Sequence, residues 1–460
     1  MAVLSGRNFV LAAAVAGLFA AMPASADVNT DANALFVGAV QAWTAAAAIP
    51  ADDPAGAAER AELLETVNRD LDQIINDLPG SDLAVRLITG ETLGPITLQG
   101  ARDALAQTNA AASGLECAAA PSPACLVQEA LPDLAMIDDR MSLILAMTGL
   151  FRPIIMSDDI DGALALMAEY PNIMSSEVYQ SSIAQAHARL GQDDVARALI
   201  NQPELEFGGQ MIMAGIAKGQ AEAGRFTDAA ATAAQITDPL QRLIALAAAR
   251  QFTEALAQLD LIPIDQEPTA INQLAVAMAR AGQIGPATAL VSEVSIGAFR
   301  RQMIAEISLA QARVGQIDEA IGTAQSLEFP DAIELLLALW YASPDPRIVV
   351  DLQARFDSTP PDARGRRLIL VAMSIVSSDP AYAAEAEAIL NASPDERTRQ
   401  QLQSFDATFQ VAAGRYAQAS ALAIALPHAD PGAAMIRIDA IGYIAQAMAA
   451  DPRMNTPANP

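Results

Sequence analysis

The residues best suited to metal binding or redox chemistry in this chain are two histidines and two cysteines. His187 and His428 are 241 positions apart, and neither belongs to an H-E-x-x-H or comparable ligand spacing. Cys117 and Cys125 stand eight positions apart, whereas a redox pair usually has C-x-x-C spacing in a βαβ context. We therefore predict no metal site and no cofactor. We expect a structural disulfide between Cys117 and Cys125, with a redox or metal-binding pair as the alternative.

The stretch SDDIDG (157–162) resembles a calcium-binding loop only superficially. Aligned on Gly162, it places Ser157 at position one and Ala168 at position twelve, where an EF-hand requires an acidic residue and a glutamate. The alternative is a helix start, with Asp161 as the capping residue before GALALMAEY. We favour the helix start.

No catalytic motif is present either. The segment GETLG (90–94) lacks the Gly-Lys-Ser/Thr of a phosphate-binding loop, so we interpret it as a turn between helices. There is no G-x-S-x-G elbow for a nucleophilic serine. Carboxylate pairs such as Asp138 and Asp139 carry little information in so acidic a chain. The sequence predicts that the protein is not an enzyme.

The first 26 residues have the pattern of a cleavable signal peptide. Arg7 precedes an apolar run from Phe9 to Met22, and Ala24-Ser25-Ala26 provides small residues for cleavage. The run is shorter than the roughly 20 residues of a membrane span. We therefore expect a periplasmic protein, or alternatively a secreted one, with no membrane span after cleavage.

Composition and charge narrow the class further. The chain is 52% apolar but only 4% aromatic, because much of the apolar content is alanine, the best helix former. The formal charge is −27, with Lys218 as the single lysine. Such a charge repels nucleic acid and anionic lipids, so we expect no nucleic-acid partner. The simplest role of the acidic surface is solubility.

The elements that position all these residues form a quasi-repeat. Landmark residues follow one another at intervals of 33, 26, 32, 33, 31, 34 and 34, at Gly191, Gly224, Arg250, Gly282, Gly315, Pro346, Pro380 and Gly414. Gly149 is a candidate for one earlier unit. A period near 33 predicts stacked helical hairpins, in which glycine ends the first helix and each hairpin shares its core with its neighbours.

Small and apolar residues recur at fixed places around these landmarks. The pattern resembles tetratricopeptide repeats over about residues 176–430, and it departs from them at Asp351 and Glu385 and in lacking most Trp and Tyr positions. The resemblance implies close helix contacts at the small residues and an apolar plug after each turn. The small residues are Ala184, Ala217, Ala275, Ser308 and Ala407, then Ala196, Ala229, Ala255, Ala287, Ala320 and Ala419; the plugs are Phe226, Phe252, Ile284, Ile317 and Tyr416.

The resemblance also implies a concave groove lined by the first helix of each hairpin. Within it, Arg189, Lys218, Arg280 and Arg313 would form a basic stripe for an acidic peptide segment; the alternative is that arginines near helix ends simply complement the helix dipole. The projected groove residues are Gln185, Arg189, Lys218, Glu222, Asn272, Arg280, Gln302 and Arg313.

We thus predict an all-α protein, an α-solenoid with a small helical N-terminal region. The expected segments are a signal peptide (1–26), the N-terminal region (27–113), a disulfide loop (114–126), the solenoid (127–450) and a disordered tail (451–460). The expected function is an exported scaffold that binds a peptide or protein, in cell-envelope assembly, secretion or polymer export. The alternative is a small-molecule-binding, glycan-binding or processing protein that uses the N-terminal region.

Overall fold

The computed structural model describes residues 28–50, 56–174, 177–201, 209–295, 297–360, 364–393, 395–451 and 453. These residues are mostly helical and contain no strand, only an isolated bridge between Leu93 and Ile96. The prediction of an all-α solenoid is confirmed. The chain forms two compact units, residues 1–116 and 117–460. The predicted signal peptide lies outside the described residues.

The smaller unit is helical, as expected for the N-terminal region. Its helices are α2 (Val28–Ala48), α3 (Ala57–Asp77), α4 (Asp82–Ile88) and α5 (Leu98–Ala119). Helices α2 and α3 pack along each other around Val67, Leu71 and Ile74, which are fully buried. Ser81 caps α4 by accepting a hydrogen bond from the Ala84 backbone. The unit therefore has a core of its own.

The disulfide between Cys117 and Cys125 is confirmed. The expectation of a loop over residues 114–126 was wrong, because helices extend into it from both sides. Helix α5 continues to Ala119, and α6 begins at Pro123. Ser122 caps α6 by accepting from the Cys125 backbone, so only residues 120–122 lie between the helices.

The larger unit is a succession of helical hairpins. After α6 (Pro123–Ala130) and η1 (Leu131–Met136) come α7 (Arg140–Met156), α8 (Ile160–Glu169), α9 (Pro171–Met174), α10 (Glu177–Arg189), α11 (Asp193–Ala198), η2 (Leu199–Asn201), α12 (Gln210–Glu222), α13 (Phe226–Ala233), α14 (Pro239–Ala248), α15 (Phe252–Leu256), η3 (Leu259–Leu261), α16 (Glu267–Arg280), α17 (Ile284–Val291), α18 (Gly297–Arg313), α19 (Ile317–Gln325), α20 (Asp331–Ala342), α21 (Pro346–Ser358), α22 (Arg364–Ser377), α23 (Pro380–Asn391), α24 (Glu396–Ala412), α25 (Tyr416–Ile424) and α26 (Pro431–Ala450).

Residues with a left-handed backbone end most of the first helices of these hairpins. Gly224, for example, has φ +76° and ends α12, where glycine adopts this conformation without the strain that a side chain brings. Arg250 takes the same conformation at φ +61°, as its place among the landmarks predicts. Residues with positive φ stand at the ends of α7, α10, α12, α14, α16, α18, α22 and α24: Asp158, Gly191, Gly224, Arg250, Gly282, Gly315, Ser378 and Gly414.

Three details of the predicted repeat were wrong. Gly149 is not a turn, because it lies inside α7, and the turn of that unit is at Asp158. Pro346 and Pro380 instead begin α21 and α23, behind the capping aspartates of those helices. The cap of α8 is Asp159, which accepts from the Gly162 backbone, and not Asp161.

The small residues predicted at the helix contacts are all fully buried. Ala196, Ala229, Ala255, Ala287, Ala320 and Ala419 have no exposed surface, and Ala184, Ala217, Ala275, Ser308 and Ala407 have none either. Ser308 Oγ donates to the backbone oxygen of Ala320, 2.9 Å away. The two helices of that hairpin thus meet at the small residues.

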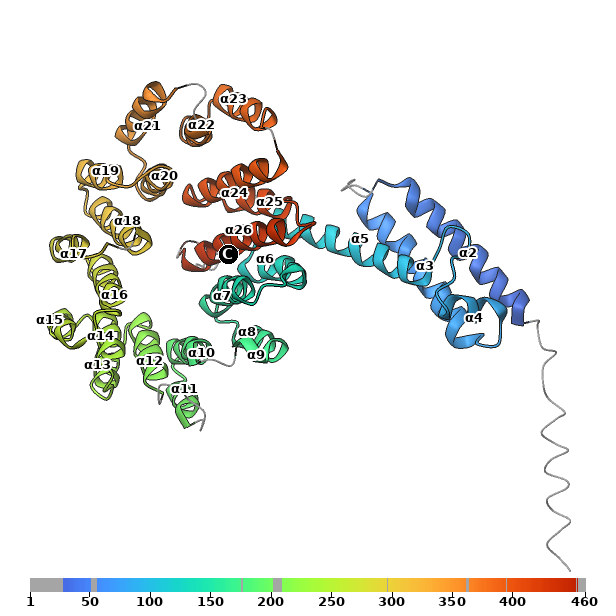
Figure 1. Cartoon of the computed structure of the whole chain (residues 1–460), viewed down its shortest axis with the longest axis horizontal. Helices are drawn as coiled ribbons and strands as arrows, with labels where there is room; N and C mark the ends of the chain where they lie inside the picture. Colours follow the sequence, from blue (N-terminus) through green and yellow to red (C-terminus); the bar gives the residue numbers. More distant parts are fainter. Residues whose placement is uncertain are drawn as a thin grey trace, which may run out of the picture. The chain divides into compact units, whose positions relative to one another are not determined.

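The first helices of the hairpins form a ring in the larger unit. Helix α7 packs on α10, and the contacts continue from α10 to α12, α14, α16, α18, α20, α24 and α26. Helix α26 then packs against α6 and α7, so the last helix of the chain meets the first of the unit (Figure 1). The second helices of the hairpins lie outside this ring (Figure 1).

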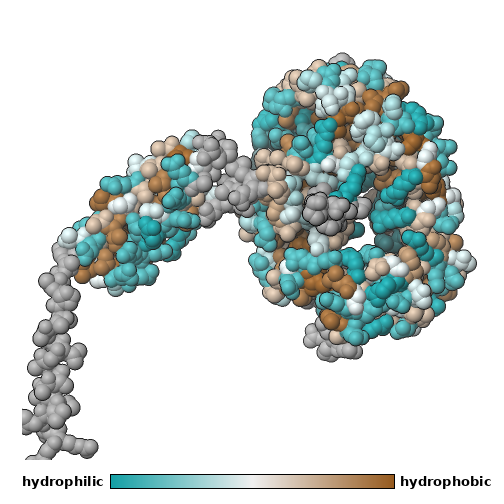
Figure 2. Space-filling model, turned by 180° about the vertical axis from the view of Figure 1, so that it is seen from behind, coloured by the Kyte–Doolittle hydropathy of each residue, from teal (hydrophilic) through white to brown (hydrophobic). Residues whose placement is uncertain are grey.

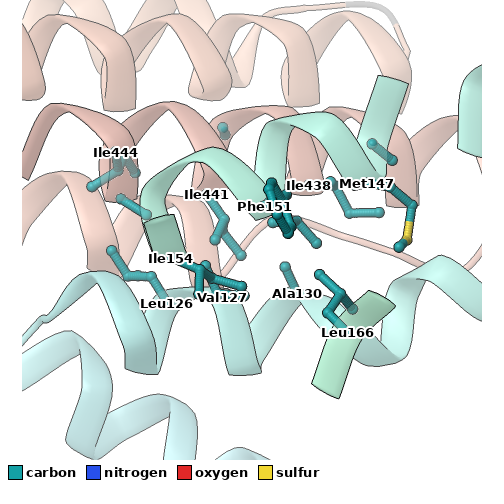
Figure 3. Packing of buried hydrophobic residues seen from close by; sticks show 14 of the residues in the cluster. Leu126, Val127, Ala130, Met147, Phe151, Ile154, Leu166, Ile438, Ile441 and Ile444 are labelled. Atoms are coloured by element: carbon teal, nitrogen blue, oxygen red, sulfur yellow. The ribbon is translucent and has the colours of Figure 1, made fainter. Parts of the chain in front are cut away.

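An apolar cluster packs the last helix, α26, against α6 and α7 and so closes the ring. Figure 3 shows Ile438, Ile441 and Ile444 of α26 facing residues of α6 and α7. Gly442 approaches α7 so closely that a Cβ atom there would lie 3.1 Å from the backbone oxygen of Gly149. The facing residues are Leu126, Val127, Phe151 and Ile154, each less than a tenth exposed.

The predicted disordered tail (451–460) was wrong for its first residues. Asp451 accepts hydrogen bonds from the hydroxyl groups of Tyr341 and Tyr416, at 2.8 and 3.0 Å. The Arg453 guanidinium lies over the Tyr341 ring, 3.5 Å from its centroid. These contacts attach the end of α26 to α20 and α25. Of the remaining tail residues none is described.

Candidate binding surface inside the ring

The larger unit is hollowed at its centre, and hydrophilic residues line the hollow (Figure 2). The exposed residues Met141, Leu145, Thr148 and Arg152 of α7 follow one another at spacings of four, three and four, which place them on one side of the helix. The charges of Glu222 on α12 and Arg280 on α16 shift the pKa of Arg152 in opposite directions: Glu222 raises it and Arg280 lowers it. Neither helix is a neighbour of α7 in the ring. The charges of these three side chains therefore act on one another, although their helices are not adjacent in the ring. We call the surface that they form the inner face.

Glu222 is the centre of a polar group on the inner face. It accepts from Gln185 Nε2 at 2.6 Å and from Arg189 Nη1 at 2.9 Å. Arg189 also donates through Nε to Asp158 at 2.9 Å and through Nη2 to the Ile155 backbone at 2.6 Å. The charge of Arg189 is thus balanced within the protein.

Arg280 is balanced in the same way. Its Nε donates to Glu306 Oε1 on α18 at 3.0 Å, and a second contact joins Nη2 to the same oxygen. This ion pair raises the pKa of Arg280, against the opposing effect of burial. The side chain of Arg280 nonetheless remains more than half exposed.

Lys218 and Arg152 differ from these two. Within the described part of the chain, neither side chain makes an ion pair or a hydrogen bond to a carboxylate. Burial lowers the pKa of Lys218; Glu222 opposes that shift, and repulsion by Arg152 and Arg280 adds to it. Burial and Arg280 also lower the pKa of Arg152. The two side chains are cations held close to other cations.

The predicted groove residues divide into two groups. Gln185, Arg189, Lys218, Glu222 and Arg280 come together on the inner face, as described above. Asn272 does not belong with them, because its side chain is 2% exposed and donates to Gln302 Oε1 at 3.0 Å. Gln302 is exposed on α18 and held by that bond; Arg313 is exposed at the end of α18, two turns beyond Glu306.

Sequence reasoning missed Arg152 and Glu306. Arg152 precedes the region of the tetratricopeptide resemblance, and it reaches the group because α7 packs on α10, which in turn packs on α12. The sequence did carry one signal for Arg152. It shares a helix face with Met141 and Leu145, and an arginine beside apolar residues indicates that this face is exposed to solvent.

An acidic group joins α20 and α26. Glu334 of α20 accepts from the Tyr443 hydroxyl of α26 at 2.5 Å. Burial raises the pKa of Glu334, and of Asp439 one turn before Tyr443. Asp331 of α20 pairs with Arg301 at 3.2 Å.

The histidines and cysteines do not form a metal centre. His187 Nδ1 lies 2.6 Å from Gln192 Oε1, and His428 Nδ1 lies 2.6 Å from Asp133 Oδ1. In the part of the chain that is described, no three His, Cys, Asp or Glu side chains are grouped as metal ligands. Nor does any described helix have the length and apolar character needed to cross a membrane.

No protein-family model matches the chain. No curated protein matches it either.

Proposed function

We propose that the protein is a scaffold whose larger unit binds an anionic segment of a partner protein at the inner face. The observation that carries this proposal is the pair of cations, Arg152 and Lys218, which make no hydrogen bond or ion pair to a carboxylate of the described residues, in a chain of net charge −27. In a protein so short of positive charge, cations left over at the centre of a concave surface favour an anionic ligand.

Apolar contact would supplement the charges. Exposed ion pairs contribute only about 0–1 kcal/mol each, so charge alone gives weak binding. Met141 and Leu145, 63% and 58% exposed, lie on the same face of α7 as Arg152. A segment that carries acidic and apolar residues fits both features. Concave surfaces of stacked helical hairpins commonly bind extended partners in this way.

The proposal includes an exported location. The disulfide supports an oxidising compartment, and the signal-like N-terminus favours the bacterial periplasm, with secretion as the alternative. Repeats of the tetratricopeptide kind are part of the same proposal, supported by the buried alanines and the left-handed turn residues. Envelope assembly, secretion and polymer export are the processes in which such a scaffold would act.

Crosslinking and capture from native cells test the proposal. The wild-type chain should retain a stoichiometric protein, and the variant Arg152→Glu with Lys218→Glu should lose it. The control is Arg86→Glu, because Arg86 is exposed on the smaller unit. Retention of the same protein by the double variant, or capture by residues 27–116 alone, would refute binding at the inner face.

A further inference from the structure

The charges around Glu222 are uneven. Four cations, on α7, α10, α12 and α16, surround it: Arg152, Arg189, Lys218 and Arg280. Three carboxylates, Asp158, Glu222 and Glu306, face these cations, and hydrogen bonds commit them to Arg189 and Arg280. One positive charge is therefore left over in this group.

The contacts of the described residues give this extra positive charge no role in holding helices together. Arg189 and Arg280 each tie two helices together through their ion pairs. Arg152 and Lys218 join no two helices in this way, because neither makes an ion pair within the described residues. Each also lies near other positive charges. Keeping partly desolvated cations together is unfavourable unless an anion joins them.

We propose that Arg152, Lys218 and Arg280 together bind one oxyanion group, a carboxylate or a phosphate, of the ligand. The inference rests on the proposed function and adds the group that is recognised. Arginine offers a planar fork and lysine a compact charge, and both suit such groups. Glu222, held by Gln185 and Arg189, opposes the incoming anion because its own charge lies beside the site.

The test uses the full mature chain and two probes. These are inorganic phosphate and an eight-residue glutamate-rich peptide, titrated by calorimetry at low salt. Lys218→Met and Arg152→Met should each weaken binding about tenfold or more, since each removes a charge-assisted hydrogen bond. Glu222→Gln should strengthen it several-fold. Arg313→Met, an exposed arginine outside the group, is the matched control and should change little.

The probes also separate the two sources of the anion. Binding of the peptide alone identifies a carboxylate, and binding of phosphate alone identifies a phosphate. If neither binds, or if Lys218→Met and Arg152→Met bind both as wild type does, the inference is overturned. Lys218→Arg, which keeps the charge, should bind, and this excludes misfolding as the cause of a loss.

Failure of the proposed function gives a different result. In that case the probes bind with the expected dependence on Arg152 and Lys218, but no partner protein is captured from cells. Conversely, capture of a partner that does not depend on these residues leaves the scaffold role standing and refutes the anion site.

Discussion

Arg437 Nη1 lies 2.5 Å from Asp133 Oδ2, although 304 residues separate the two in sequence. Both are almost fully buried. Arg437 also donates to the backbone oxygen of Glu129, at 3.0 Å. This group joins α26 to the first helices of the larger unit, beside the apolar cluster that closes the ring.

Replacement of Arg437 by methionine should destabilise the larger unit by about 3–5 kcal/mol, because the Asp133 carboxylate stays buried without its main cation. Unfolding in guanidinium can be followed by Trp340 fluorescence in a Trp43→Phe background, since these are the only two tryptophans. Arg399→Met removes a surface ion pair with Glu396 and should cost at most about 1 kcal/mol. Equal effects of the two changes would contradict the role of Arg437 in closing the ring.

A second prediction concerns the contact between α10 and α12. A Cβ atom at Gly219 would lie 2.1 Å from the backbone oxygen of Gln185, so the two helices cannot keep their separation with any larger residue. Gly219→Ala should destabilise the larger unit by about 1–3 kcal/mol, measured by the same fluorescence. It should also disturb the inner face, since Gln185 and Lys218 flank this contact.

Gly322→Ala is the matched control for that change. A Cβ atom at Gly322 meets nothing within 4 Å, and the residue lies inside α19. Alanine there should therefore stabilise the helix by up to about 1 kcal/mol. The same sign for both substitutions would show that the close approach of α10 and α12 is not a constraint.

The hairpins were predictable from sequence because their determinants are local. Turn residues such as Gly224 and buried small residues such as Ala320 recur at a fixed period, and each acts within its own hairpin. Closure of the ring was not predictable, because the 304 residues between Asp133 and Arg437 leave no periodic trace. Arg152 was missed because α7 lies before the recognised repeats, although it packs on α10, the first of their helices.

Some residues predicted to line the groove are instead bonded to other residues of the protein. Asn272 has the same spacing as groove residues, but a polar side chain satisfied by Gln302 can lie inside the contact between α16 and α18. The sequence likewise shows where the arginines are, but it does not predict which carboxylates pair with them. Arg280 and Arg189 proved to be paired, and Lys218 did not.

A third prediction tests the small-residue contact within one hairpin. Ala320 is fully buried against Ser308, so Ala320→Leu should overpack this contact and cost about 1–3 kcal/mol. Ala289→Leu is the control, because Ala289 is exposed on α17. Thermal unfolding should show a lower midpoint for the first variant only. An unchanged midpoint would mean that α18 and α19 do not meet at Ala320.

The last prediction concerns the pH dependence of anion binding. Burial lowers the pKa of Lys218, Glu222 opposes that shift, and Arg152 and Arg280 reinforce it. An anion binds the charged ammonium, so affinity should be full below the pKa of free Lys218 and fall as pH rises through it. Because this pKa is below the usual value of 10.5, the fall should begin at lower pH than an ordinary lysine would give.

The same linkage predicts proton uptake. A bound anion favours the charged ammonium and raises the pKa of Lys218, so near the pKa of the free protein each binding event takes up a fraction of a proton. Calorimetry with the glutamate-rich peptide in two buffers of different ionisation enthalpy measures this, because the peptide carboxylates stay ionised throughout. Lys218→Arg should bind without this pH dependence, since a guanidinium stays charged. A wild-type profile as flat as that of Lys218→Arg would show that the ammonium of Lys218 does not contact the anion.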